Sequence, residues 1–289
     1  TDWRGVADEV DVFYNLGPND VHADPSIAAL EADTHVFCEK PLAHTLADAE
    51  RMAEAAVDSG ATAGVAFNYR FVPAVQYAKR LIEDGALGDV HHVRAEYLQD
   101  WLVDPTAPWS WRNSEEIAGS GALGDLGAHS VDLAQYLLDE RIARVSGHLK
   151  TFVDERPVPG EPGSALDADG EDATETRSVT VDDAYTAQAE FESGTMGVFE
   201  ASRYATGHKN GNVIEINGSE GSIRFDLERL NELEVPSGDR RGFETVMVTD
   251  PDDPYVDRWW PPGHVLGWEH TFVHENYEFL TAVASDEPH

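Results

Sequence analysis

Apolar and polar positions follow two different periods in the first 70 residues. Short apolar, β-branched runs stop at glycine or proline, as the run 10–16 does at Gly17, and are typical of buried parallel strands. Stretches with helical spacing lie between them, and the longer one begins at Thr45, a capping residue, and ends at Gly60. The predicted strands are 10–16, 35–38 and 63–67, and the predicted helices are 25–32 and 45–60. This strand–helix alternation predicts a doubly wound parallel sheet.

The pattern changes after Pro73, and from Val145 onward strands dominate, separated by turns such as Ser193-Gly194. Helices are predicted at 74–83, 121–138 and 269–284, and strands at 92–99, 178–192, 195–202, 212–217 and 222–227. We therefore expect an α/β protein in which a partial Rossmann-type dinucleotide-binding domain (1–70) precedes an α+β domain (71–289). The second domain should hold a large open, mainly antiparallel sheet with helices on one face. The segment 154–177 should be a long exposed loop.

Charge narrows the range of partners. The 289 residues include 20 Lys and Arg against 55 Asp and Glu, a net charge of −35, which disfavours nucleic acid and anionic membranes as partners. No apolar stretch reaches the length of a membrane span. The basic residues include only four lysines: Lys40, Lys79, Lys150 and Lys209. Dispersed carboxylates and few lysines predict a protein of a salt-loving organism, with an ordinary acidic enzyme as the alternative.

The cysteine content and the start of the chain bear on the compartment. Cys38 is the single cysteine, so it has no partner for an internal disulfide. No secretory signal opens the chain. Both features favour a cytoplasmic protein.

The first candidate for chemistry is Glu39-Lys40-Pro41, at the end of the second predicted strand. Ligands of doubly wound sheets bind at the carboxyl ends of the strands, and the proline restricts the backbone beside the lysine. Lys40 is also one of very few lysines in the chain. These features favour a functional ammonium group, with a surface ion pair to Glu39 as the alternative.

The second candidate is the glycine-rich segment 118–132, which contains Asp125 and His129. These two residues are four apart and share a helical face, so the carboxylate could orient the imidazole as a general base. Each glycine costs roughly 1 kcal/mol in a helix interior, which makes sense if another backbone or a flat ligand packs closely there. The alternatives are a capped helix with a buried histidine and, more weakly, a metal site; we predict no metal.

Several shorter motifs also indicate a ligand-binding pocket. Asn68, Tyr69 and Arg70 follow the third strand, and Trp111 and Arg112 lie shortly before the glycine-rich segment. Rings and guanidinium groups can stack on a sugar face or a planar ring. His264 and His270 are weaker candidates. Motifs of nucleophilic or phosphate-loop enzymes are missing from the sequence.

Taken together, Glu39-Lys40-Pro41, the segment 67–71 and the Asp125–His129 spacing resemble the glucose–fructose oxidoreductase / inositol dehydrogenase / rhizopine-catabolism (Gfo/Idh/MocA) family. The resemblance covers nearly the whole chain. It implies a Rossmann domain, an open-sheet domain, and transfer of a hydride between NAD or NADP and a sugar, cyclitol or related polyol. The resemblance also implies pairing of subunits into a dimer or tetramer through the open sheet.

The resemblance assigns roles to individual residues. Lys40, Asp125 and His129 would be catalytic, with His129 as the acid/base, Lys40 beside the reacting hydroxyl, and Asp125 binding substrate or orienting the imidazole. The cofactor would contact Pro18, Asn19, His22, Glu39, Lys40, Pro41, Asn68, Trp111 and Arg112. The substrate would contact Lys40, Tyr69, Arg70, Asp125 and His129.

The sequence departs from the family pattern at its start. The family's Rossmann domain opens with a strand, a Gly-x-Gly-x-x-Gly turn and a helix. This sequence begins at Thr1 and does not contain them, so we expect a chain truncated at its N-terminus. Two other functions remain open on this scaffold. One is a regulatory protein that binds sugar and nucleotide without turnover, and the other is an NAD-dependent glycosidase.

Overall fold

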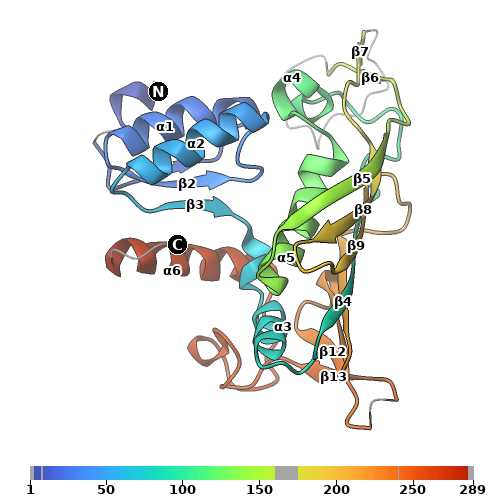
Figure 1. Ribbon diagram of the computed structural model, residues 1–289. Helices are drawn as coiled ribbons and strands as arrows, with labels where there is room; N and C mark the ends of the chain where they lie inside the picture. Colours follow the sequence, from blue (N-terminus) through green and yellow to red (C-terminus); the bar gives the residue numbers. More distant parts are fainter. Residues whose placement is uncertain (1–2, 8, 160–174, 240, 286–289) are drawn as a thin grey trace.

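The computed structural model describes residues 3–7, 9–159, 175–239 and 241–285 (Figure 1). Its first part is a three-stranded parallel sheet in the order β1-β2-β3. The elements of this part are η1 (Trp3–Gly5), β1 (Val12–Asn15), η2 (Asn19–Val21), α1 (Ala23–Glu31), β2 (His35–Glu39), α2 (Leu46–Asp58) and β3 (Ala63–Ala66). The Thr45 side chain caps α2 by accepting from the amide of Asp48. The predicted βαβαβ unit is confirmed.

The second part is an eight-stranded sheet in the order β13-β12-β11-β10-β4-β9-β8-β5. Its strands are β4 (Val90–Leu98), β5 (Ile142–Lys150), β8 (Ala184–Phe191), β9 (Met196–Ser202), β10 (Gly211–Gly218), β11 (Ser222–Asp226), β12 (Glu232–Pro236) and β13 (Phe243–Met247). All neighbours are antiparallel except β4 and β9, which are parallel. The predicted open, mainly antiparallel sheet is therefore confirmed, although β5, β12 and β13 were not assigned from the sequence.

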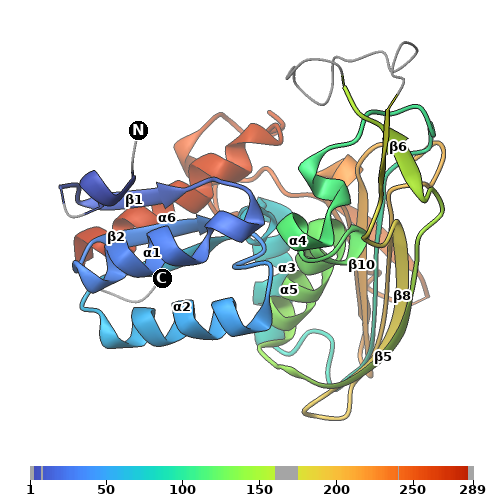
Figure 2. The ribbon, with the colours of Figure 1, turned by 90° about the horizontal axis from the view of Figure 1, so that it is seen from above.

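Helices fill the space between the two sheets. Figure 2 shows α3, α4 and α5 between the parallel part and the large sheet. They are α3 (Pro73–Glu83), α4 (Glu115–Ala118) and α5 (Ala128–Leu138), with η3 (Asn68–Phe71), η4 (Trp111–Asn113) and a π-helical turn (Leu123–Gly127) beside them. One face of the large sheet is thereby buried, whereas nearly every residue of β5 is exposed. Two further turns are η7 (Leu227–Arg229) and η8 (Val256–Arg258).

The last helix, α6 (Glu269–Ser285), returns to the first part of the chain. It lies across the parallel sheet on the face opposite α1 and α2 (Figure 1). Phe279 of α6 is fully buried, with its ring 4.7 Å from that of Phe37 on β2. Asn68 also donates to Thr271 at 2.8 Å. The second face of the parallel sheet is therefore covered by a helix from the far end of the chain.

The prediction of an exposed loop at 154–177 is wrong at both ends. Residues 160–174 lie outside the described part of the chain, but β6 (Glu155–Pro157) pairs with β7 (Thr176–Ser178). Arg156 is fully buried and donates to the backbone carbonyls of Leu102, Asp104 and Ala107. Composition predicted exposure, but a buried guanidinium with enough carbonyl acceptors is stable.

Candidate active site

Lys40 projects from the end of β2 toward the second part of the chain. Its ammonium group donates to the backbone carbonyl of Asp125 at 2.7 Å and to the Oδ1 atom of the same residue at 3.3 Å. The side chain is only 14% exposed. Lys40 therefore does not form the surface ion pair with Glu39 that was the alternative. Lys40 instead links the parallel sheet to the glycine-rich segment.

The backbone of the glycine-rich segment 118–132 packs closely against two other stretches of backbone. A Cβ atom on Gly121 would lie 1.7 Å from the carbonyl oxygen of Asp182, and one on Gly119 would lie 2.2 Å from that of His44. The Asp182 carboxylate accepts from the amides of Gly121 and Leu123, which begin the π-helical turn. Of the two explanations for the glycines, close packing of backbone is the one observed.

His129 lies at the start of α5 in an aromatic environment. Its ring centroid is 4.6 Å from that of Tyr69, 6.0 Å from Tyr97 and 5.9 Å from Phe67. Burial, with the positive charge of Lys40, holds the pKa of His129 well below its usual range. The imidazole is therefore neutral at physiological pH and can accept a proton.

The idea that Asp125 orients His129 is wrong. Among the contacts of the described residues, the Asp125 carboxylate turns to Lys40 through Oδ1 and to Arg203 through Oδ2, which lies 4.0 Å from Nη1. The Nδ1 atom of His129 is buried without a hydrogen-bond partner in this part of the chain. A shared helical face brings the two residues to one place but does not join their side chains.

Two cavities meet at Lys40. The larger, of about 640 Å³, is lined by seven of the predicted cofactor residues: Pro18, Asn19, Glu39, Lys40, Pro41, Trp111 and Arg112. The smaller, of about 260 Å³, is lined by Asn68, Tyr69 and His129 among others. Glu39, Lys40 and Asp125 line both cavities. The structure therefore brings most of the predicted site together around one ammonium group.

Three predicted residues lie elsewhere. His22 is fully buried and its ring nitrogens contact the carbonyls of Pro41 (3.0 Å) and Gly17 (2.9 Å), so it braces the cavity wall without lining it. Asn68, predicted to bind cofactor, lines the smaller cavity. Arg70, predicted to bind substrate, forms a bidentate pair with Asp132 and lines a separate cavity of about 750 Å³. The proximity of Arg70 to Asn68 in sequence was misleading because the turn η3 sends their side chains in different directions.

Several site residues were not found from the sequence. Arg203, Phe272 and Glu275 line the larger cavity, and Asn210, Trp268 and again Phe272 line the smaller one. Asn210 accepts from the Tyr97 hydroxyl (2.7 Å) and from Gln99 (2.8 Å). These residues are far from the predicted motifs along the chain. No pattern identified in the sequence pointed to them.

Glu275 on α6 introduces an unusual carboxyl group into the larger cavity. It is 1% exposed, and its Oε1 atom has no hydrogen-bond partner among the described residues. Burial, with repulsion from Glu39, raises the pKa of Glu275 to about 8. Burial also raises the pKa of Glu39. Both groups favour the neutral form more than ordinary glutamates do.

The larger cavity fits a nicotinamide nucleotide. Its volume lies in the usual range of small-molecule sites, about 300–1,000 Å³. Its wall also holds buried polar atoms that lack partners in the described structure, on Arg203 and Glu275, as expected where a polar ligand supplies them. The described residues include no group of three or more His, Cys, Asp or Glu arranged to hold a metal ion. None of the helices in the described ranges is long and apolar enough to cross a membrane.

The fold and the two adjoining cavities define an oxidoreductase with a Rossmann-type, NAD-binding part. Family models agree: residues 1–67 match the oxidoreductase family with an NAD-binding Rossmann fold, and residues 75–224 match the GFO/IDH/MocA C-terminal domain. The chain belongs to the GFO/IDH/MocA family, whose cofactor is NAD or NADP.

Relatives of this family have been characterised. A levoglucosan dehydrogenase of Pseudarthrobacter phenanthrenivorans is 42% identical over 98% of this chain and 74% of its own length. A solved oxidoreductase domain protein of Kribbella flavida is 49% identical, with a TM-score of 0.92 over 100% of this chain and 75% of that one. A levoglucosan dehydrogenase solved with NADH and levoglucosan is 40% identical, with a TM-score of 0.91 and the same coverage. This chain thus spans about three quarters of the length of these relatives.

Proposed function

We propose that the protein is an NAD- or NADP-dependent dehydrogenase that moves a hydride between the nicotinamide and a hydroxyl-bearing carbon of a cyclic sugar, cyclitol or related polyol. One observation carries the proposal. Lys40 stands at the boundary of two cavities, one of a size and polarity suited to a nicotinamide and the other lined by a neutral histidine. Hydride transfer requires the hydride acceptor and the alcohol to lie next to each other, as ligands of these two cavities would.

The residues divide the chemistry between them. His129, neutral in its aromatic surroundings, accepts the proton of the reacting hydroxyl. The Lys40 ammonium stabilises the charge that develops on the oxygen, and Asp125 holds that ammonium in place. A bound nicotinamide would supply the hydride acceptor. Pro18, Asn19, Trp111 and Arg112, which line the larger cavity, would hold it there.

The smaller cavity suits a sugar ring. Tyr69, Tyr97 and Trp268 offer ring faces and edges to an apolar sugar face, while Gln99 and Asn210 add amide groups for its hydroxyls. The levoglucosan dehydrogenases among the relatives act on a cyclic sugar, as their name states, which supports the same substrate class here.

A direct assay tests this proposal. The protein is incubated with NAD⁺ or NADP⁺ and a panel of anhydrosugars, aldoses and inositols, and reduced nicotinamide is followed by absorbance. We expect turnover with at least one substrate and its loss in Lys40→Met and His129→Ala. Cofactor binding without turnover across the panel would support the regulatory alternative. Sugar release from glycosides without net reduction would support the glycosidase alternative.

We further propose a division of labour along the chain. Residues 1–70 bind the cofactor, and 71–289 bind the substrate and pair with other copies, with α6 crossing back to the parallel sheet. Apolar side chains of the large sheet are exposed on its edge strand β5, including Val145 (70% exposed) and Leu149 (52%), and on the outer face at Met196 (64%) of β9, and a second copy would cover them in a dimer or tetramer. Light scattering that shows a monomer would contradict this pairing.

The acidic surface supports a protein that works in the cytoplasm of a salt-loving organism. At 1 M salt the screening length is about 3 Å, which removes most repulsion among dispersed carboxylates. We expect the melting temperature to rise between low salt and molar KCl, because the net charge is −35. A melting temperature that is the same in both conditions would leave an ordinary acidic enzyme.

A further inference from the structure

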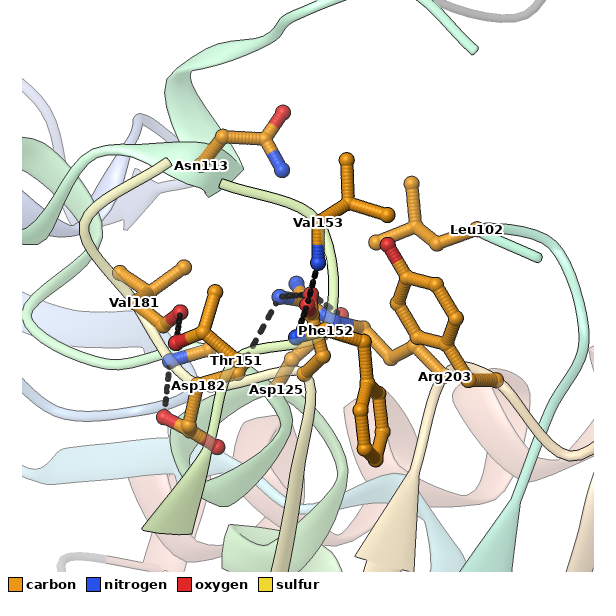
Figure 3. A network of polar contacts seen from close by, with 12 residues as sticks. Leu102, Asn113, Asp125, Thr151, Phe152, Val153, Val181, Asp182 and Arg203 are labelled. Carbon is orange, nitrogen blue, oxygen red and sulfur yellow. Dashed lines mark hydrogen bonds and ion pairs between the residues drawn. The ribbon is translucent and has the colours of Figure 1, made fainter. Parts of the chain in front are cut away.

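Arg203, at the end of β9, is the most completely buried cation beside the catalytic residues. Its side chain has 0% exposure. The Nη2 atom donates to the Asp182 carbonyl at 2.9 Å and lies 3.7 Å from Oδ1 of Asp183, while Nη1 lies 4.0 Å from Oδ2 of Asp125. Figure 3 shows this network, with Arg203 close to Asp125 and to the chain around Asp182.

A comparison with Arg156 shows that burial alone does not explain this placement. Arg156 is equally buried and donates to three backbone carbonyls and to the Tyr204 hydroxyl. The Arg203 guanidinium makes one hydrogen bond among the described residues, and its Nε and Nη1 atoms lack hydrogen-bond partners there. Since unsatisfied charged groups are costly when buried, Arg203 is poorly placed for stability. Departures of this kind are expected at functional positions.

The poorly satisfied side of Arg203 faces the one carboxylate that also holds Lys40. Oδ1 of Asp125 accepts from Lys40, and Oδ2 faces Arg203. A carboxylate between two cations is restrained in rotation, because turning it would weaken both attractions. The backbone of the same residue is fixed as well, since the Asp182 carboxylate caps its helical turn. Arg203 and Asp182 therefore restrain both ends of Asp125.

We propose that Arg203 is a positioning residue for the hydride transfer: by attracting Oδ2 of Asp125, it keeps Oδ1 on Lys40 and fixes the Lys40 ammonium between the two cavities. The catalytic meaning of this role rests on the proposed function. The contact chain Arg203–Asp125–Lys40 itself can be tested without cofactor or substrate.

The scarcity of lysines provides a direct measurement. The four lysines are labelled with a small acylating reagent under native conditions, and the rate at each is followed by peptide mass spectrometry. We expect the Lys40 rate to rise about tenfold in Arg203→Met, the effect of losing one charged contact. Lys79 is similarly protected, at 15% exposure beside Glu83, and serves as the internal reference.

Matched variants separate positioning from general loosening. Arg156→Met removes an equally buried arginine that is not among the residues lining either cavity, and should leave the Lys40 rate unchanged while lowering the melting temperature. Asp125→Asn should raise the Lys40 rate, and adding Arg203→Met to it should raise the rate no further, because the arginine acts through Asp125. Arg203→Gln, which removes the charge but keeps an amide that can donate to the Asp182 carbonyl, is the second variant if the methionine does not fold.

Two results would overturn the proposal. One is an unchanged Lys40 rate in a folded Arg203→Met or Arg203→Gln protein, and the other is an equal rise in Arg156→Met. In the turnover assay, Arg203→Met should lower kcat about tenfold or more with KM for the sugar nearly unchanged. If the wild type shows no turnover but the labelling pattern is as expected, the proposed function fails while the contact chain stands.

Discussion

The two cavities that meet at Lys40 are built on different principles. The larger one is lined by charged groups, among them Glu39, Arg203 and Glu275, and several of their polar atoms have no partner in the described part of the chain. The smaller one shares Glu39, Lys40 and Asp125 with it, but the rest of its wall is mostly rings and amides, of which Tyr69, Tyr97, Gln99 and Asn210 are hydrogen-bonded to one another. The first is prepared for a ligand that supplies charge and hydrogen bonds, and the second for a ligand whose shape and hydroxyls must match a fixed wall.

The hydrogen bonds within this fixed wall form a chain with a defined donor-to-acceptor direction. Tyr97 donates its hydroxyl proton to Asn210 (2.7 Å), so in its 2.9 Å contact with Tyr69 it must accept. Tyr69 in turn accepts from the indole of Trp268 at 3.4 Å. Each hydroxyl proton is thus committed, and what remains for a substrate is mainly acceptor capacity. Substitutions at His129, Lys40, Glu275 and Tyr97 test this contrast between the charged cavity and the one whose hydroxyls are already bonded, with expected effects that decrease in that order.

The largest effect is expected at the boundary of the two cavities, in His129→Ala. Removing the general base should lower kcat by about 10²–10⁴-fold. The matched control is His264→Ala, since His264 is exposed and lines neither cavity. Steady-state kinetics on both variants decide the matter; equal turnover in the two would remove His129 from the mechanism.

Lys40→Met should come next, with a loss in kcat of about 10²–10³-fold, because one charged stabiliser of the oxyanion is removed. Lys79→Met, which breaks an ion pair with Glu83 on α3 and a contact with the Tyr136 ring, should retain activity. Single-turnover measurements with saturating cofactor separate loss of chemistry from loss of cofactor binding. Full activity of Lys40→Met would show that the meeting of the cavities is incidental.

Glu275→Gln tests the charged cavity through stability. The pKa of Glu275 is raised to about 8, above the ordinary value of 4.5, so folding favours the protonated form. The wild type should lose stability as pH rises from 4.5 through about 8, by on the order of a few kcal/mol, and the variant should not show this part of the loss. Urea unfolding at pH 5 and pH 9 measures it; parallel curves for the two proteins would mean that Glu275 titrates normally.

Tyr97→Phe tests the committed cavity and should have the smallest effect. It leaves the Tyr69 hydroxyl without its acceptor and removes one donor from Asn210. We expect KM for the sugar to rise about tenfold with kcat little changed, a cost of about 1–2 kcal/mol. Tyr277→Phe, on the exposed side of α6, is the control. A larger drop in kcat than in KM would assign Tyr97 a part in the chemistry.

The sequence predicted the local elements well because their signals are local. Thr45 caps α2 as expected, and the apolar runs of β1 to β3 form the parallel sheet. It also predicted Lys40 and His129 as members of one site, since both follow from motifs at the ends of recognisable elements. Strand β13 gave a weaker signal because it is mostly exposed and lacks a buried face.

The sequence could not predict side-chain directions or partners distant in the chain. Arg70 and Asn68 are two residues apart but face different cavities. Arg203 reaches Asp125 across 78 positions, a pairing set only when β9 packs beside the π-helical turn. Asp125 and His129 share a helical face, yet the carboxylate is oriented toward two cations and not toward the imidazole. These outcomes depend on tertiary packing, which periodicity does not encode.

The glycine packing described above sets a limit for anyone who wishes to redesign the enzyme. At Gly121 any side chain would collide with the Asp182 carbonyl at 1.7 Å, and at Gly127 with the Tyr185 ring at 2.5 Å, so random libraries that include these positions would be filled with misfolded clones. The wall formed by Tyr97, Gln99, Asn210 and Trp268 contains no glycine. Directed evolution toward other sugars should therefore vary that wall and leave the glycine-rich segment untouched.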